Sequence, residues 1–413
     1  MLSTQRTRFL LAAGFLAAAA AEASDEEPPI DIPSDTELQF SADPYADQDK
    51  LDMVKSGVAK LAGIRYEATS FSSANTGYTG VYGDFCVYDA RLNYVEDPSL
   101  YPTIDDMMLT SDHCGEHTYT LPLDVVVAAV SSHDISNVQV NPPVDGMLFH
   151  LGHSGAGVVS NALATFDSAL VVPEHPAITD ALFACDHIHN RHESADCSSS
   201  LQKKLVEDVI NLATRSSDAS ITHAYIKFNA DSTAYISMAR DILPNAAWTF
   251  HYRDSDTTLA KSTQANRNSC VFKRRQPSSH LAEKAILLGI DLDGMSQEDL
   301  CALYLSTLFE VAINEYENSE TGMLVPYAQL VEAGYITDVV LPFFGLQAEI
   351  DADPAMVSAN VETTLTTKSN TRGVPGNKVQ QWNANDEVIH ISDKVRAASA
   401  LFMGNVFETV ERL

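Results

Sequence analysis

The residues best suited to chemistry lie in one stretch, between Gly146 and Glu174, which contains a glycine-rich turn. The turn reads Leu-Gly-His-Ser-Gly-Ala-Gly (residues 151–157) and separates an apolar run from a segment with the apolar spacing of a helix. A glycine-rich turn at a helix N-terminus directs backbone N–H groups and the positive end of the helix dipole at one point, which suits an anion such as phosphate. We therefore expect an anion to be bound by Gly152, His153, Ser154, Gly155, Ala156 and Gly157.

A carboxylate follows the next apolar run, because a short strand predicted at 169–172 delivers Glu174 at its C-terminal end. A carboxylate at an apolar strand end is suited to general-base catalysis. The alternative is a structural role, in which Glu174 is stabilised by the dipole of the helix predicted at 177–185. His175, directly beside it, is a weaker candidate for the base.

Short apolar strands alternate with helical segments from residue 138 onward. This alternation predicts an α/β fold of three layers, with a central parallel sheet covered by helices on both faces. The expected strands are 147–150, 169–172, 223–228, 248–252 and 323–326. Ligands of such sheets bind at the carboxyl edge of the strands, so we expect the glycine turn, Glu174 and Arg253 to meet there.

Composition divides the chain into four predicted parts. These are a signal peptide (1–23), an acidic disordered lead-in (24–45), an irregular α+β accessory region (46–137) and the main α/β domain (138–413). The first part has arginines, an Ala-rich apolar run and a small-x-small cleavage site, and the second is rich in acidic residues and proline. Within the accessory region, helices are expected at 49–61 and 122–130, and no chemical motif stands out.

Charge and hydropathy limit the partners of this 413-residue chain, whose formal net charge is −30. Such a field repels the phosphate backbone of DNA and RNA, so we expect no nucleic-acid partner. The N-terminal apolar run is too short for a comfortable membrane span, and no other stretch is long enough. No membrane span is therefore expected after signal cleavage; the alternative is an uncleaved N-terminal anchor.

Six cysteines follow the predicted signal peptide, and an even number in this context predicts disulfide bonds. The local pairs are Cys86–Cys114 and Cys185–Cys197, although sequence does not determine connectivity. The segment from Cys185 to Cys197 is also rich in histidine, which raises metal binding as an alternative. Its spacing fits no standard zinc pattern, so we expect a disulfide-closed loop and no metal site.

Three segments together resemble the P-loop sulfotransferases, which move a sulfuryl group from 3′-phosphoadenylyl sulfate (PAPS) to an acceptor hydroxyl. The turn LGHSGAGVVSN is similar to the 5′-phosphosulfate loop of that family. The segment WTFHYRDSDTTLAKS is similar to the strand, turn and helix that bind the 3′-phosphate. GMLVPYAQL followed by LPFFGL is similar to the family's late strand, helix start and apolar turn, and the set spans residues 146–413 in the family's order.

The resemblance implies a P-loop fold, PAPS as co-substrate without a metal, and roles for individual residues. Arg253 corresponds to the family's ligand of the 3′-phosphate. Glu174 stands where the secreted tyrosylprotein branch has a catalytic glutamate, and His153 stands where the family has a cation. The remaining residues assigned to the co-substrate by resemblance are Lys261, Ser262, Arg372 and Gly373.

The chain departs from the family pattern at several of these positions. His153 replaces a lysine or arginine, and Ala156 and Gly157 replace hydroxyl-bearing residues. The serine expected eight residues after Arg253 is Lys261, with Ser262 one place later. One alternative is therefore a catalytically degenerate P-loop protein that binds a nucleotide or a sulfated ligand. A second is a P-loop kinase or NTPase, which the absence of a Gly-Lys-Ser/Thr motif disfavours.

The expected function is sulfuryl transfer in the secretory pathway, either in the Golgi lumen or after secretion. The expected partners are PAPS and an acceptor hydroxyl. The acceptor is left open between a protein tyrosine, a carbohydrate and a small molecule.

Overall fold

The computed structural model describes a large part of the chain, all of it within one compact unit, Asp47–Leu413. The described residues are 48–72, 77, 79–88, 103–111, 114–115, 117–136, 141–191, 197–264, 269–332, 334–366 and 389–413. The predicted signal peptide and lead-in, and the two site residues Arg372 and Gly373, lie outside these ranges.

Five parallel strands form the centre of the fold, and all five correspond to predicted strands. They are β4 (Val144–His150), β5 (Ala169–Pro173), β6 (His223–Lys227), β7 (Ala247–Tyr252) and β8 (Gly322–Pro326). Their order in the sheet is β5-β6-β4-β7-β8, and every neighbouring pair is parallel. The predicted α/β class with a central parallel sheet is confirmed.

The register of the sheet aligns the carboxyl ends of its strands. Pro173 lies opposite Lys227, and His150 lies opposite His251. The chain leaves the central strand β4 toward β5 on one side and later reaches β7 on the other. Such a reversal at a carboxyl edge is where open α/β sheets bind ligands.

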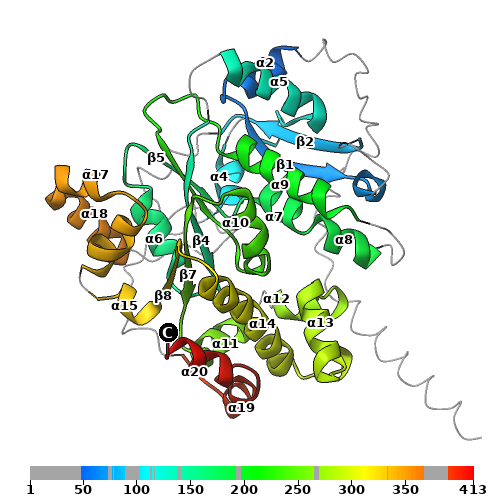
Figure 1. The fold of residues 1–413 in the computed structure, drawn as a ribbon, viewed down its shortest axis with the longest axis vertical. Coiled ribbons are helices and arrows are strands. Elements are labelled where there is room, and N and C mark those ends of the chain that lie inside the picture. Colours follow the sequence, from blue (N-terminus) through cyan, green and yellow to red (C-terminus); the bar gives the residue numbers. More distant parts are fainter. Residues whose placement is uncertain are drawn as a thin grey trace, which may run out of the picture. The chain divides into compact units, whose positions relative to one another are not determined.

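Helices cover both faces of this sheet (Figure 1). The helix α6 (Ala156–Leu163) packs with α18 (Pro354–Thr366) on one face. The helices α10 (Ile236–Ile242) and α14 (Gln297–Glu317) lie on the other. The helix α14 starts after Ser296, whose hydroxyl accepts the N–H of Asp299 at 3.1 Å.

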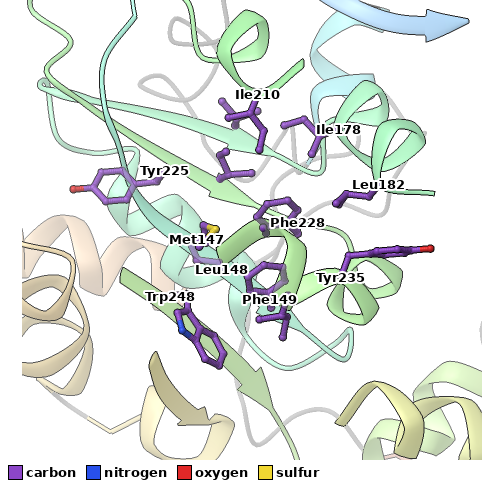
Figure 2. Close-up of a cluster of buried hydrophobic side chains, with 14 of the residues drawn as sticks. Met147, Leu148, Phe149, Ile178, Leu182, Ile210, Tyr225, Phe228, Tyr235 and Trp248 are labelled. Carbon is purple, nitrogen blue, oxygen red and sulfur yellow. The ribbon is translucent and has the colours of Figure 1, made fainter. Parts of the chain in front are cut away.

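Aromatic side chains fill the interior beneath the sheet (Figure 2). Phe149 of β4 stacks on Phe228 with ring centroids 4.5 Å apart, and Trp248 of β7 meets Phe149 edge-on at 6.3 Å. The indole N–H of Trp248 donates to Ser319 Oγ at 3.0 Å, so its polar atom is satisfied. These contacts join β4 to β7 and to Phe228, directly after β6.

Further helices complete the main domain. They are α7 (Pro176–Leu182), α8 (Ala184–Arg191), α9 (Ser199–Ala213), η2 (Ala230–Tyr235), α11 (Ser255–Gln264), α12 (Ser269–Arg275), α13 (Ser279–Leu288), η3 (Leu292–Gly294), α15 (Tyr327–Leu330), η4 (Ile336–Val340), α16 (Leu341–Phe343), α17 (Gln347–Ala352), α19 (Asp393–Phe402) and α20 (Gly404–Val410). The last two, α19 and α20, meet at Met403.

The accessory region forms an antiparallel sheet with the order β1-β2-β3. Its elements are α2 (Gln48–Lys55), β1 (Lys60–Tyr66), η1 (Ala68–Phe71), β2 (Val81–Cys86), α4 (Ile104–Thr110), β3 (Tyr119–Pro122) and α5 (Leu123–Ser136). The helix expected at 49–61 is wrong in its second half. Gly57 adopts a φ of 73° directly after α2 and ends it, because glycine favours this left-handed conformation at a helix terminus.

Three disulfide bonds cross-link the described part of the chain, and both predicted local pairs are confirmed. The bonds are Cys86–Cys114, Cys185–Cys197 and Cys270–Cys301. Three such bonds fit an oxidising compartment. Among the described helices, none combines the length and the apolar character that crossing a bilayer requires.

Replacing Gly146 by alanine should destabilise the sheet. A Cβ atom there would lie 2.5 Å from Phe344 Cδ1 and 2.7 Å from Tyr225 Cδ1, so these rings must move. We expect the free energy of unfolding to fall by about 1–3 kcal/mol, measured by urea denaturation. The control is Gly404→Ala at the start of α20, where nothing lies within 4 Å of the new atom and stability should be kept or raised. Equal effects of both changes would contradict the packing argument.

Candidate functional site

Each of the five strands places one candidate side chain at the carboxyl edge of the parallel sheet. His150 ends β4 and Lys227 ends β6. Glu174, Arg253 and Tyr327 directly follow β5, β7 and β8. The glycine turn continues from the central strand, and His150 and Tyr327 lie directly against it.

The glycine turn between β4 and α6 bends through the left-handed region of backbone conformation. The φ angle is 82° at Gly152, 52° at His153 and 88° at Gly155. A Cβ atom at Gly155 would also lie 2.7 Å from Leu330 Cδ1, so both backbone and packing require glycine there. Gly155 O accepts the N–H of Val158 at 2.9 Å, which starts α6 and places the helix N-terminus at the turn.

Ser154 lies inside this turn with a buried hydroxyl. The residue is 1% exposed, and its Oγ is without a hydrogen-bond partner in the described structure. Leaving a buried hydroxyl unpaired costs about 1–3 kcal/mol, so Ser154 Oγ marks a position that a ligand atom would satisfy. Ala156 is buried and Gly157 half-buried in the first turn of α6, where they contribute backbone only, and His153 is exposed.

His153 and Glu174 are the non-glycine residues with positive φ in the described ranges, at 52° and 48°. Holding a side chain in this region costs about 1–3 kcal/mol, and residues of this kind cluster at functional sites. The two residues predicted to act in catalysis are therefore the two that carry this backbone strain.

Glu174 is joined to Lys227 by side chain and main chain. Lys227 Nζ donates to Glu174 Oε1, and the N–H of Glu174 donates to Lys227 O at 2.6 Å. The side chain of Lys227 is only 7% exposed. The pair therefore fixes a buried positive charge and a proton acceptor side by side next to the glycine turn.

His150 lies between the turn and this ion pair. Its Nδ1 accepts the N–H of Gly152 at 2.8 Å, and its Nε2 is 3.7 Å from Glu174 Oε1. Burial lowers the pKa of His150 to about 4, and the charge of Lys227 lowers it further, against a smaller opposing effect of Glu174. The imidazole is therefore neutral at physiological pH.

His175 does not act as the base in this arrangement. Its Nδ1 accepts the N–H of Ala177 at 3.1 Å, and its Nε2 therefore donates to Leu61 O at 3.0 Å. Both nitrogens are engaged, the ring is buried, and burial lowers its pKa to about 4. His175 instead ties the accessory strand β1 to the start of α7.

Arg253 reaches the glycine turn through Tyr327. Its guanidinium lies over the Tyr327 ring, 4.3 Å from the centroid, and its Nε is 3.7 Å from Asp254 Oδ2. A Cβ atom at Gly155 would lie 3.2 Å from Cδ2 of the same ring. One aromatic ring thus contacts both the turn and the arginine that were predicted to bind the two ends of one ligand.

The other residues predicted to bind the co-substrate are less closely placed. Lys261 and Ser262 lie half-buried on α11 after Arg253. Ser262 Oγ donates to Thr258 O at 2.9 Å, within the helix. A role for these residues remains a prediction, as it does for the two residues outside the described ranges.

Three residues of the site have no assigned role in the sequence argument: His150, Lys227 and Tyr327. His150 ends a predicted strand, Lys227 is the last residue but one of another, and Tyr327 follows a third. Their position at a carboxyl edge is the signal that points to them, but their mutual contacts depend on the strand order. Strand order in a parallel sheet is not local in sequence, so the contacts of Lys227 with Glu174 appear only in the structure.

Comparison with known proteins gives matches among solved structures alone. No protein-family model matches the chain, and no curated protein matches it. The sulfotransferase STF9 from Mycobacterium avium is 11% identical, with 91% of this chain and 98% of that chain covered and a TM-score of 0.40. The sulfotransferase STF1 from Mycobacterium tuberculosis H37Rv is 11% identical, with 78% and 89% covered and a TM-score of 0.28.

A third similar structure is the sulfotransferase domain from the curacin biosynthetic pathway. It is 10% identical, with 50% of this chain and 75% of that chain covered and a TM-score of 0.29. Likenesses at this level carry no argument about activity, which has to come from the residues of the site.

Stability should depend on pH through His175. The folded protein holds this imidazole neutral down to about pH 4, whereas an unfolded histidine binds a proton below about pH 6.5. The unfolded state therefore binds more protons, and the free energy of unfolding falls as pH drops from about 6.5 to 4. Urea denaturation at pH 7 and 5 should show a decrease that is about 1–2 kcal/mol smaller in His175→Asn than in the wild type. An equal decrease in both proteins would contradict a neutral buried imidazole.

Proposed function

We propose that this protein transfers a sulfuryl group from PAPS to an acceptor hydroxyl. The observation that carries the proposal is the buried, unpaired hydroxyl of Ser154 in a left-handed glycine turn at a helix N-terminus. Such a turn receives an anion. A carboxylate placed for proton transfer stands beside it, and that combination is what sulfuryl transfer to a hydroxyl requires.

The 5′-phosphosulfate is assigned to the turn. Backbone N–H groups of residues 154–157 and the Ser154 hydroxyl donate to its oxygens, where charge develops during transfer. Lys227 adds a buried positive charge close to the same place, and His153 adds one when it is protonated. Lys227 is proposed to replace part of the positive charge that the family's lysine or arginine at the position of His153 supplies.

The 3′-phosphate is assigned to Arg253. A planar guanidinium binds phosphate through paired hydrogen bonds, and the Tyr327 ring restricts its orientation. Lys261, Ser262, Arg372 and Gly373 are proposed to complete this part of the site.

Glu174 is the proposed general base. It takes the proton of the acceptor hydroxyl while the acceptor oxygen forms a bond to sulfur. The bond from sulfur to the phosphate oxygen breaks in line, and adenosine 3′,5′-bisphosphate leaves. The contact with Lys227 holds the carboxylate in place throughout this step.

We further propose that the reaction takes place in the secretory pathway, in the Golgi lumen or outside the cell. The predicted signal peptide and the three disulfides support this location. The position of Glu174 supports a relation to the tyrosylprotein branch, with a protein tyrosine, a carbohydrate or a small molecule as acceptor.

Adenosine 3′,5′-bisphosphate should bind and raise the melting temperature of the purified protein. We expect Arg253→Ala to weaken this binding by about 10- to 100-fold, since a charge-assisted pair to phosphate contributes about 1.5–3 kcal/mol. Ser154→Ala should weaken it several-fold. Arg412→Ala is the matched control, because this exposed arginine contacts only Glu408 at 3.4 Å among the ion pairs of the described chain. If the melting temperature of the wild-type protein does not change with this nucleotide, the assigned ligand is refuted.

Labelled sulfate from PAPS should be transferred to a hydroxyl acceptor, and Glu174→Gln should reduce kcat by about 10²- to 10⁴-fold with little change in nucleotide affinity. The assay uses a panel of tyrosine peptides, sugars and phenols. Ligand binding without any transfer would favour the degenerate binding protein, and hydrolysis of ATP would favour the kinase or NTPase. Full activity in Glu174→Gln would remove the base assignment while leaving the reaction in place.

A further inference from the structure

His150 is a buried titratable side chain that contacts the glycine turn and lies near Glu174. It is 7% exposed at the end of β4. Its Nδ1 accepts the N–H of Gly152, and a neutral imidazole that accepts at one nitrogen carries its proton on the other. The tautomer is therefore determined, and Nε2 is the nitrogen that bears hydrogen.

The Nε2–H group has an acceptor close by but is not yet bonded to it. Nε2 is buried and makes no well-formed hydrogen bond; the main chain of Phe228 interacts with the ring, and Glu174 Oε1 is 3.7 Å from Nε2. A buried donor that stays unpaired costs about 1–3 kcal/mol. Catalytic hydrogen bonds are often long before the ligand binds and shorten in the complex. A shift of the carboxylate by less than one ångström brings Glu174 within reach.

We propose that His150 is a positioning residue that joins the anion-binding turn to the general base, with Nδ1 holding Gly152 and Nε2–H holding Glu174. The inference rests on the proposed function, because it assigns the base role to Glu174. Binding of the anion orders the turn, the turn holds the imidazole, and the imidazole orients the carboxylate. The histidine does not touch the substrate and does not exchange protons in the cycle.

Ionisable groups from every neighbouring element face His150. They are Lys227 of β6, Glu174 after β5, His153 in the turn and His251 of β7. Burial and the charge of Lys227, with a further contribution from His153, lower the pKa of His150 to about 4 against opposing effects of Glu174 and the Phe228 main chain, so the ring is a neutral donor across the working range. Burial likewise lowers the pKa of His251 to about 3. The positive charge beside Glu174 therefore comes from Lys227, and His150 orients the Glu174 carboxylate.

Two amide substitutions separate the two contacts of the ring. In His150→Asn, the side-chain oxygen lies near the Nδ1 position and still accepts from Gly152, but the donor to Glu174 is lost. In His150→Gln, the amide lies near the Nε2 position and still donates to Glu174, but the acceptor for Gly152 is lost.

The expected results of the pair are opposite. His150→Asn should bind adenosine 3′,5′-bisphosphate within about 3-fold of the wild type, while kcat falls about 10- to 100-fold, as for loss of a hydrogen bond to a charged group. Removing a donor to a carboxylate favours its protonated form, so the acid limb of the pH profile of kcat moves to higher pH. His150→Gln should keep kcat within about 5-fold and bind the nucleotide about 10-fold more weakly, because the turn is less ordered.

Equal losses in both variants, with an unchanged pH profile, would show a purely structural role and overturn the proposal, as would wild-type behaviour of His150→Asn. If His150→Asn fails to fold, His150→Ser removes both contacts and should show both defects. A second readout does not need activity: the ¹³C NMR titration of the Glu174 carboxyl should have a higher midpoint in His150→Asn than in the wild type. A wild-type protein without sulfuryl transfer refutes the proposed function, whereas an unchanged NMR midpoint refutes the link through His150.

Discussion

An ion pair between the ends of two adjacent strands governs the geometry of the candidate site. Lys227 and Glu174 are joined through side chains and main chain, in a place where the lysine is 7% exposed. Removing one partner of such a pair leaves a buried charge uncompensated, which costs about 3–5 kcal/mol. That constraint sustains the left-handed backbone of Glu174 at φ 48°, which an unsupported glutamate would relax.

The same pair explains how a strongly acidic chain can present an anion site. With a net charge of −30, the surface as a whole repels a phosphosulfate. In the proposed site the attraction is local and is assigned to Lys227 and Arg253, whose side chains are 7% and 14% exposed at the carboxyl edge. Buried charges are screened little by salt. Binding of a nucleotide should consequently depend less on ionic strength than it would at an exposed basic patch.

Much of this arrangement follows from local sequence, and the rest from long-range topology. Apolar spacing and the positions of glycines predict the five strands, the glycine turn and the position of Glu174. Both signals act over a few residues. The contact of Lys227 with Glu174 depends on β5 lying beside β6 in the sheet. The two residues are 53 positions apart in the sequence. The predicted extension of α2 to residue 61 is wrong, because Gly57 adopts a left-handed conformation and ends the helix.

The ring of Tyr327 has a consequence for ligand selection. It packs against the turn at Gly155 and under the guanidinium of Arg253, so the ring lies between the two proposed anion-binding points and separates them. A ligand whose two charged groups are separated by a different distance can occupy only one of these two proposed points. The residue directly after the last strand of the sheet thereby sets the length of ligand that the proposed site selects, without contributing a charge of its own.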